Sequence, residues 1–291
     1  MSKAEKKNIA MSVRMRLLNL SRETCIDFMK LLTRYLQERL LYRIAISSHR
    51  QHLLLKGSSL LYAHHPFNAR PTVDIDLLGQ DWSNNETAVS EAFMQICSLP
   101  CEEDGVIFDA ESLQLRPIAI EKKYPGLCVI VEAHLDSIRQ PISVDIGFGD
   151  VVTPSPVFLT YPVLLDDVPQ PQLWAYSLES SIAEKFHAMI ERDSQNSRMK
   201  DFYDLYTLFT EYDVDDSILK MAVHDTFINR GTHYVENAAL FSPEFATDTN
   251  RVKQWNAFLK KIKYPDLLPL DDVVKCICEH MISIWTPINI E

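Results

Sequence analysis

The sequence lacks the features that define several common protein classes. It contains no run of about 18 apolar residues, so we expect no membrane span. The amino-terminal stretch has no apolar core followed by a small-residue cleavage site, so we expect no signal peptide. Neither Gly-x-Gly-x-x-Gly nor Gly-x-x-x-x-Gly-Lys-Ser/Thr occurs, which disfavours dinucleotide-binding and P-loop proteins. These absences favour a cytoplasmic protein without a membrane partner.

Cysteine is sparse and scattered. Six cysteines in 291 residues do not form a disulfide framework, and a chain of this size does not need one, so reduced thiols in a cytoplasm fit best. Cys276 and Cys278 stand close to His280 in "KCICEH". This spacing lacks the Cys-x-x-Cys pair of structural zinc sites, and no second pair exists. We therefore expect helix cysteines here and no zinc site.

Charge is distributed unevenly along the chain. The formal net charge is −11, which argues against broad, non-specific nucleic-acid binding. Residues 1–50, however, hold eleven Lys and Arg against four acids, whereas the remainder holds eighteen against thirty-six. A basic segment on an acidic body is compatible with an RNA partner. A solvated helix face of mixed charge explains the same count.

The punctuation by Gly and Pro divides the chain into three parts. Residues 1–50 contain few breakers and predict a basic helical arm, in which "TCIDFMKLLTRYLQERLLYRIAI" has helical spacing and Ser21 is the expected cap. Residues 51–170 predict an α/β core, with short β-rich runs "HLLLK", "TVDIDLL", "LCVIVEAHL" and "ISVDIGF" around a helix near 85–97. Residues 171–291 predict a helical domain whose first helix begins at a Ser177 cap.

The stretch "TVDIDLL" places two carboxylates on one face of a strand. Side chains alternate along a strand, so Asp74 and Asp76 point to one face while Ile75 points to the other. Two aspartates two residues apart lie within ~7 Å and repel each other. Bound Mg²⁺ or Mn²⁺ removes this conflict, since hard cations bind through carboxylates and substrate phosphates.

A third carboxylate occurs in a similar setting. Asp145 lies between Val144 and Ile146 in "ISVDIGFG". With Asp74 and Asp76 it forms a candidate set of three metal ligands. Such a set suits a two-metal displacement at phosphorus.

Upstream, "LLLKGSSLLYA" predicts a strand, a sharp turn and a helix. Gly57 would let a phosphate approach the backbone, and the helix start with Ser58 and Ser59 would supply donors. Joined to the Asp-x-Asp strand and the later lone aspartate, this turn is the signature of the DNA-polymerase-β-like nucleotidyltransferase fold. The predicted fold class is thus α/β (α+β), with a nucleotidyltransferase core between the helical arm and the helical domain.

Two stretches resemble a particular family. "LLLKGSSLL…RPTVDIDLL" and "AYSLESSIAEKFHAMIERDSQNSRMKDFYDLYTL" are similar to the signatures of the AbiEii/AbiGii nucleotidyltransferase toxins of type IV toxin–antitoxin systems. The resemblance covers roughly residues 50–210. It implies a metal-dependent transfer of a nucleoside monophosphate from an NTP, an RNA acceptor such as the 3′ end of tRNA, and a cognate antitoxin.

The resemblance also implies roles for individual residues. Asp74 and Asp76 would bind metal, with Asp145 as a less uniform third ligand. Lys185 would contact nucleotide phosphate, and Asp204 or Asp201 would be a further functional acid. The nucleotide-binding set would be Lys56, Gly57, Ser58, Arg70 and Asp201.

Alternatives stay open for these residues and for the function. A helix lysine such as Lys185 is normally solvated, Asp201 and Asp204 fit a surface salt-bridge ladder, and Arg70 could neutralise phosphate or pair with an acid. For the function, the same site could label a protein hydroxyl. A catalytically silent nucleotide- or partner-binding module is the alternative from another class.

Overall fold

The computed structural model describes residues 3–64, 72–82, 84–118 and 125–285, with side chains from residue 8 onward. The chain divides into two compact units. The first, here called the sheet unit, comprises Met1–Gly149 and Val157–Ala175. The second, here called the helical unit, comprises Asp150–Pro156 and Tyr176–Glu291. Each unit is described by itself.

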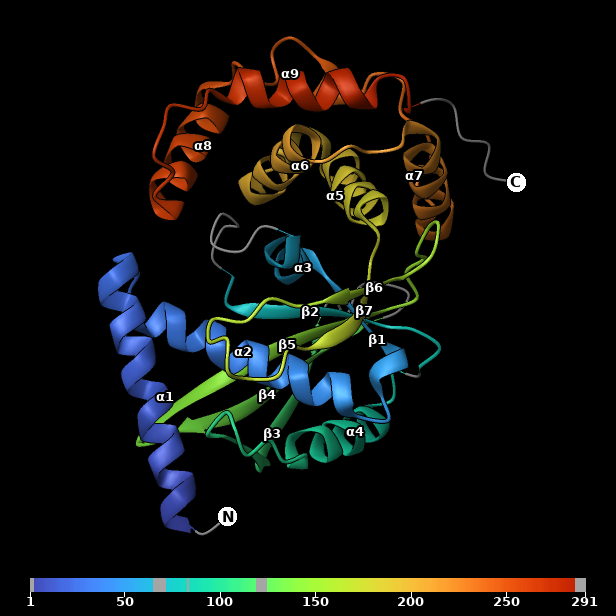
Figure 1. Ribbon diagram of the computed structural model, residues 1–291. Coiled ribbons are helices and arrows are strands. Elements are labelled where there is room, and N and C mark those ends of the chain that lie inside the picture. The colour runs from blue at the N-terminus through green and yellow to red at the C-terminus, as the bar shows by residue number, and fades with distance from the viewer. Residues whose placement is uncertain (1–2, 65–71, 83, 119–124, 286–291) are drawn as a thin grey trace. The chain divides into compact units, whose positions relative to one another are not determined.

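The described part of the sheet unit is built on one mixed seven-stranded sheet of order β3-β4-β5-β2-β1-β7-β6 (Figure 1). In its centre, β2 runs parallel to β5 and antiparallel to β1. The strands are β1 (Leu53–Lys56), β2 (Asp74–Gly79), β3 (Val106–Ile118), β4 (Gly126–Leu135), β5 (Ile138–Phe148), β6 (Val157–Thr160) and β7 (Gln172–Ala175). The sequence predicts β1, β2, β4 and β5 but not β3, β6 or β7.

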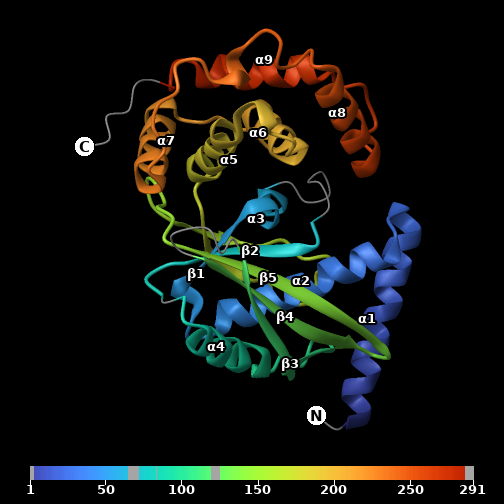
Figure 2. The same cartoon turned by 180° about the vertical axis from the view of Figure 1, so that it is seen from behind.

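The sheet has one apolar and one polar face. Alternate residues of β2, such as Ile75 and Leu77, are buried, and so are Val144 and Ile146 of β5. The other face carries half-buried polar side chains. The described helices of this unit are α1 (Lys3–Thr24), α2 (Phe28–Ile46), α3 (Gly57–His64) and α4 (Glu86–Ser98). Figures 1 and 2 show α3 on the opposite side of the sheet from α2 and α4.

The amino-terminal helices differ from the prediction. Ser21 is not a helix cap, because it lies inside α1, where its hydroxyl donates to the carbonyl of Ile26 at 2.6 Å. The chain turns at Cys25, whose φ is +56°, and α2 then starts from an Asp27 cap. The side chain of Asp27 accepts from the backbone N–H of Lys30. An acid accepting at an N-cap satisfies a helix donor in the same way that Ser21 was expected to do.

Five arginines of residues 1–50 make polar contacts inside the sheet unit. Arg14 pairs with Asp136 at 2.9 Å and Arg34 with Glu38 at 3.3 Å. The same holds for Arg16 with Asp167, Arg43 with Asp104, and Arg39 with the carbonyl of Pro169. The Arg43–Asp104 pair is almost fully buried. Arg14, Arg16 and Arg43 therefore have acidic partners outside residues 1–50 within the fold.

The described part of the helical unit contains five α-helices. They are α5 (Leu178–Arg192), α6 (Met199–Glu211), α7 (Asp216–Arg230), α8 (Thr249–Ile262) and α9 (Leu270–Met281). Ser177 caps α5 as predicted, its hydroxyl accepting from the N–H of Ser180 at 3.1 Å. Phe186 of α5 is fully buried and lies 5.9 Å from Phe227 and 5.4 Å from Trp285, measured between ring centroids. Aromatic packing of this kind fixes α5 within its unit.

Candidate functional site

The turn after β1 is shaped around an acid of β2. Helix α3 begins directly at Gly57, whose φ is +64°. A Cβ at this position would lie 2.7 Å from Cγ and 2.8 Å from Cβ of Asp76, which no ordinary contact permits. Both the left-handed backbone and this close approach require glycine. The predicted strand, turn and helix are confirmed, and the start of α3 lies against the Asp76 carboxylate.

The serines after this glycine are buried. Ser58 is 6% exposed and Ser59 is 1% exposed. The hydroxyl of Ser59 donates to the carbonyl oxygen of Asp74 at 3.3 Å, which joins the start of α3 to β2. Since the Ser59 hydroxyl serves the fold, Ser58 and the backbone N–H groups of the turn are the better candidates for holding a phosphate.

The predicted carboxylates lie side by side on the polar face of the sheet. Asp76 of β2 is in register with Asp145 of β5, and on its other side with Lys56 of β1. Asp74 lies one row along, in register with Ser143. Neighbouring strands are about 4.8 Å apart, so Asp76 and Asp145 are directly adjacent. The structure therefore brings Asp74, Asp76 and Asp145 together with Lys56 and Gly57.

The row continues through two residues that the sequence did not indicate. Cys128 of β4 is in register with Asp145, and Arg116 of β3 is in register with Cys128. Burial, a hydrogen bond to Asp145 and the negative charges of Asp145 and Asp74 raise the pKa of the Cys128 thiol to about 12, while Arg116 acts to lower it. At neutral pH the thiol is thus protonated. We call these five residues, Lys56–Asp76–Asp145–Cys128–Arg116, the carboxylate row.

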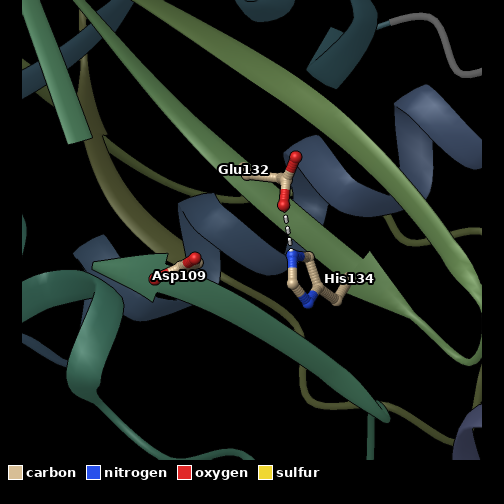
Figure 3. A group of neighbouring side chains, drawn as sticks. All are labelled: Asp109, Glu132 and His134. Atoms are coloured by element: carbon tan, nitrogen blue, oxygen red, sulfur yellow. Dashed lines mark hydrogen bonds and ion pairs between the residues drawn. The ribbon is translucent and has the colours of Figure 1, made fainter. Parts of the chain in front are cut away.

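A second set of possible metal ligands lies on the same face, farther along β3 and β4 (Figure 3). Among the residues that the structure describes, Asp109, Glu132 and His134 are the set whose donor atoms all lie within 4.8 Å of one another. His134 Nε2 is 2.6 Å from Glu132 Oε1, and Asp109 is in register with Glu132. Asp74, Asp76 and Asp145 do not form such a set in the side-chain conformations of this structure.

The three motif residues of the helical unit form a compact ion-pair cluster. Lys185 Nζ on α5 lies 2.7 Å from Asp204 Oδ2 and 3.7 Å from Asp201 Oδ1 on α6. Asp201 Oδ2 also accepts from Arg198 Nε at 2.6 Å. The side chains of Lys185, Asp201 and Asp204 are 11%, 3% and 1% exposed. Among the described residues this cluster joins two cations to two acids. Its burial fits neither a solvated lysine nor a surface salt-bridge ladder.

One predicted residue lies outside the described residues. Arg70 was expected to contact nucleotide phosphate or to pair with an acid, and it falls between residues 64 and 72. Thr72, the first described residue after it, donates a hydrogen bond from its hydroxyl to the carbonyl oxygen of Asp74 at 3.2 Å.

Comparison with known sequences identifies the family. The model of the family described as nucleotidyl transferase AbiEii toxin, type IV TA system, matches residues 39–276, which is most of the chain. The chain belongs to this family. The family comparison extends beyond the stretch of resemblance seen in the motifs and includes α7, α8 and most of α9. The family and the nucleotidyltransferase class that the motifs predicted are confirmed.

Three solved structures align with the chain at low identity. JHP933 from Helicobacter pylori aligns with a TM-score of 0.50 at 16% identity, covering 89% of this chain and 92% of that chain. A candidate nucleotidyltransferase from H. pylori gives 0.48 at 15%, with coverages of 89% and 96%. A nucleotidyltransferase-like protein from Paracoccidioides brasiliensis gives 0.35 at 12%, with coverages of 95% and 94%. At 16% identity, the likeness to JHP933 concerns the fold alone.

No match was found among curated protein sequences. Among the described residues of this AbiEii-family chain, no helix combines the length and apolar character that crossing a bilayer requires.

Proposed function

We propose that this AbiEii-family enzyme transfers a nucleoside monophosphate from an NTP to an acceptor hydroxyl at the carboxylate row. One observation carries the proposal. Asp76 and Asp145 are adjacent in register while Asp76 also lies against the Gly57 turn, so carboxylates and phosphate-binding backbone share one place. In the reaction, the acceptor oxygen forms a bond to the α-phosphorus, the bond to the bridging oxygen breaks, pyrophosphate leaves, and the hydroxyl proton passes to a carboxylate or to solvent.

The residues present fit a divalent cation and a triphosphate. Asp74, Asp76 and Asp145 are hard oxygen donors of the kind that Mg²⁺ and Mn²⁺ prefer. The absence of a side chain at Gly57 lets the backbone of the turn lie directly against Asp76. When bound, the cation would lower the pKa of the acceptor hydroxyl and neutralise charge on the phosphates. Its binding would require the carboxylates to converge, since their donor atoms are apart in this structure.

The other candidate residues take part by binding and orientation. Lys56, in register with Asp76, and the start of α3 with Ser58 would hold the β- and γ-phosphates. We propose Lys185 as a further phosphate contact, with Asp204 and Asp201 as positioning residues that keep its ammonium charged and oriented. Arg70 retains its proposed role as a nucleotide contact.

We also propose the finer features that the family suggests: an RNA acceptor with the tRNA 3′ end as the leading candidate, action in the cytoplasm, and a cognate antitoxin. The test is incubation with each of four α-labelled NTPs, Mg²⁺ and total tRNA. A labelled band that RNase removes supports an RNA acceptor, whereas a band that protease removes indicates a protein acceptor. Binding of NTP without release of pyrophosphate would make the protein a silent binding module and would reject the proposal.

A further inference from the structure

The carboxylate row has cations at both of its ends, and the two ends have different surroundings. Lys56 at one end adjoins the Gly57 turn, where the NTP phosphates are placed in the proposed function. Arg116 at the other end lies two strands beyond Asp145, roughly 10 Å away on the ~4.8 Å spacing of strands. If the phosphates of the triphosphate are bound at Gly57, the proposed function assigns no substrate group to Arg116.

Arg116 differs from four of the arginines of α1 and α2. Its guanidinium donates to Gln114 Oε1 at 3.1 Å, and it makes no ion pair with an acid in the part of the chain that the structure describes. Arg14, Arg16, Arg34 and Arg43, in contrast, each pair with a carboxylate. A neutral amide orients the Arg116 guanidinium without cancelling its charge, which suits bidentate binding of a phosphate.

The direction of the reaction places the acceptor on the Arg116 side. Attacking and leaving oxygens lie roughly in line across the α-phosphorus. Pyrophosphate held at Lys56 and the Gly57 turn leaves toward β1 and α3, so the acceptor hydroxyl approaches from β5 and the strands beyond it. Those strands are β4 and β3, and they carry Cys128 and Arg116 in the same row.

From these observations we infer that the proposed RNA acceptor lies over β4 and β3, and that Arg116 binds one of its backbone phosphates. This inference rests on the proposed function and adds to it a place for the acceptor and a residue that binds it.

The acids farther along β3 and β4 limit where such a strand can lie. Glu132 follows Cys128 by four residues on β4, or about 13 Å, and Asp109 faces it across the ladder (Figure 3). Their negative charges repel a polyanion, whereas Arg116 attracts it. The strand is therefore held at the Arg116 end of this surface and does not continue past Glu132.

The test compares Arg116→Ala with Arg139→Ala. Arg139 is a matched control, because it lies on the same face of the same sheet and is 71% exposed. It stands in the row of His134, with its guanidinium 3.9 Å from Glu132 Oε1, at the end of the surface where no strand is expected. With total tRNA as acceptor, we expect Arg116→Ala to raise the acceptor KM roughly threefold to tenfold and to lower the slope of log KM against log salt by about 1. The NTP KM should not change, and Arg116→Lys should recover part of the effect. Arg139→Ala should behave as wild type in all these measurements.

Several outcomes would overturn the inference. One is an equal acceptor KM and salt slope for the two alanine variants, and another is a label that appears on protein alone. A complete absence of transfer by the wild type would refute the proposed function instead. In that case, direct binding of fluorescent tRNA to both variants decides the inference: Arg116→Ala must bind more weakly than Arg139→Ala, and equal affinities would reject it.

Discussion

The two groups of charged residues that the motifs single out are organised in opposite ways. On α5 and α6, Lys185 and Arg198 face Asp201 and Asp204, so the charges balance in a cluster whose acids are almost fully buried. On the sheet, Asp76 adjoins Asp145 on one side and Lys56 on the other, and Asp74 lies one row along, so three acids share one directly adjacent lysine. In the first arrangement acids and cations pair with one another, whereas the second would be stabilised by a bound cation.

This difference distinguishes charged residues that stabilise the fold from charged residues placed to bind a ligand. A buried ion pair loses several kcal/mol when one partner is removed, because the remaining charge is left uncompensated. Neighbouring like charges on a sheet cost free energy as they stand, so removing one does not destabilise the fold. Each of the following substitutions tests one side of this comparison.

The largest effect is expected at the carboxylate row. Asp76→Asn removes a metal ligand and a like charge together, so we expect NTP-dependent labelling to fall roughly a hundredfold to a thousandfold or more. The melting temperature should be unchanged or raised. Asp166→Asn, at an exposed loop position, is the matched control and should label like wild type. Activity retained in Asp76→Asn would remove the metal-dependent mechanism.

The cluster of the helical unit should respond in stability. Lys185→Met removes the ammonium that lies 2.7 Å from the buried Asp204 carboxylate, and we expect a loss of about 3–5 kcal/mol in the free energy of unfolding, measured by denaturant titration. The double variant Lys185→Met with Asp204→Leu should recover most of this loss. If Lys185 also contacts phosphate, the double variant regains stability but not activity. Recovery of both would leave the lysine a purely structural role.

Glu38 is an intermediate case, a buried acid that has an arginine partner. Burial outweighs the attraction of Arg34 and Arg39 and the N–H of Leu164, and it raises the pKa of Glu38 from 4.5 to about 7. Between these values the folded state holds a proton that the unfolded state has lost, so the free energy of unfolding falls as pH rises through this window. The full change is about 3 kcal/mol at most. Glu38→Gln should remove this fall, and a pH profile identical to wild type would contradict the assignment.

The smallest effect is expected at the surface of the basic segment. Arg14→Ala breaks an ion pair with Asp136 in which the arginine side chain is 38% exposed. We expect a loss of no more than about 1 kcal/mol, reduced further by salt. If transfer to tRNA were strongly impaired by this change, residues 1–50 would have a direct role in RNA binding that their internal pairing argues against.

The sequence predicts which acids lie on the polar face of the sheet better than it predicts which segments form the strands. Alternation in "TVDIDLL" and "ISVDIGF" is enough to place Asp74, Asp76 and Asp145 on one polar face, because the side-chain period of a strand is fixed. Strand β3 escapes prediction since Glu111, Arg116 and Pro117 interrupt its apolar pattern. Its half-exposed position at the sheet edge tolerates them.

Other features depend on tertiary contacts that no local pattern reports. The break between α1 and α2 occurs at Cys25, a residue that rarely adopts a positive φ. The count of positive charges in residues 1–50 does not tell that the partners of Arg43 and Arg16 lie at Asp104 and Asp167. The apolar residues that neighbour Lys185 along its own helix likewise give no sign that its ammonium pairs with Asp204.

The most direct test of the account is cation binding at the carboxylate row. Mn²⁺ can be titrated in the presence of a non-hydrolysable NTP and followed by electron paramagnetic resonance, with wild type compared with Asp76→Asn and Asp145→Asn. We predict that wild type binds Mn²⁺ together with the nucleotide and that both variants bind it at least tenfold more weakly, roughly the cost of one lost ligand. Equal Mn²⁺ affinity in all three proteins would contradict the claim that these adjacent carboxylates exist to hold a metal ion.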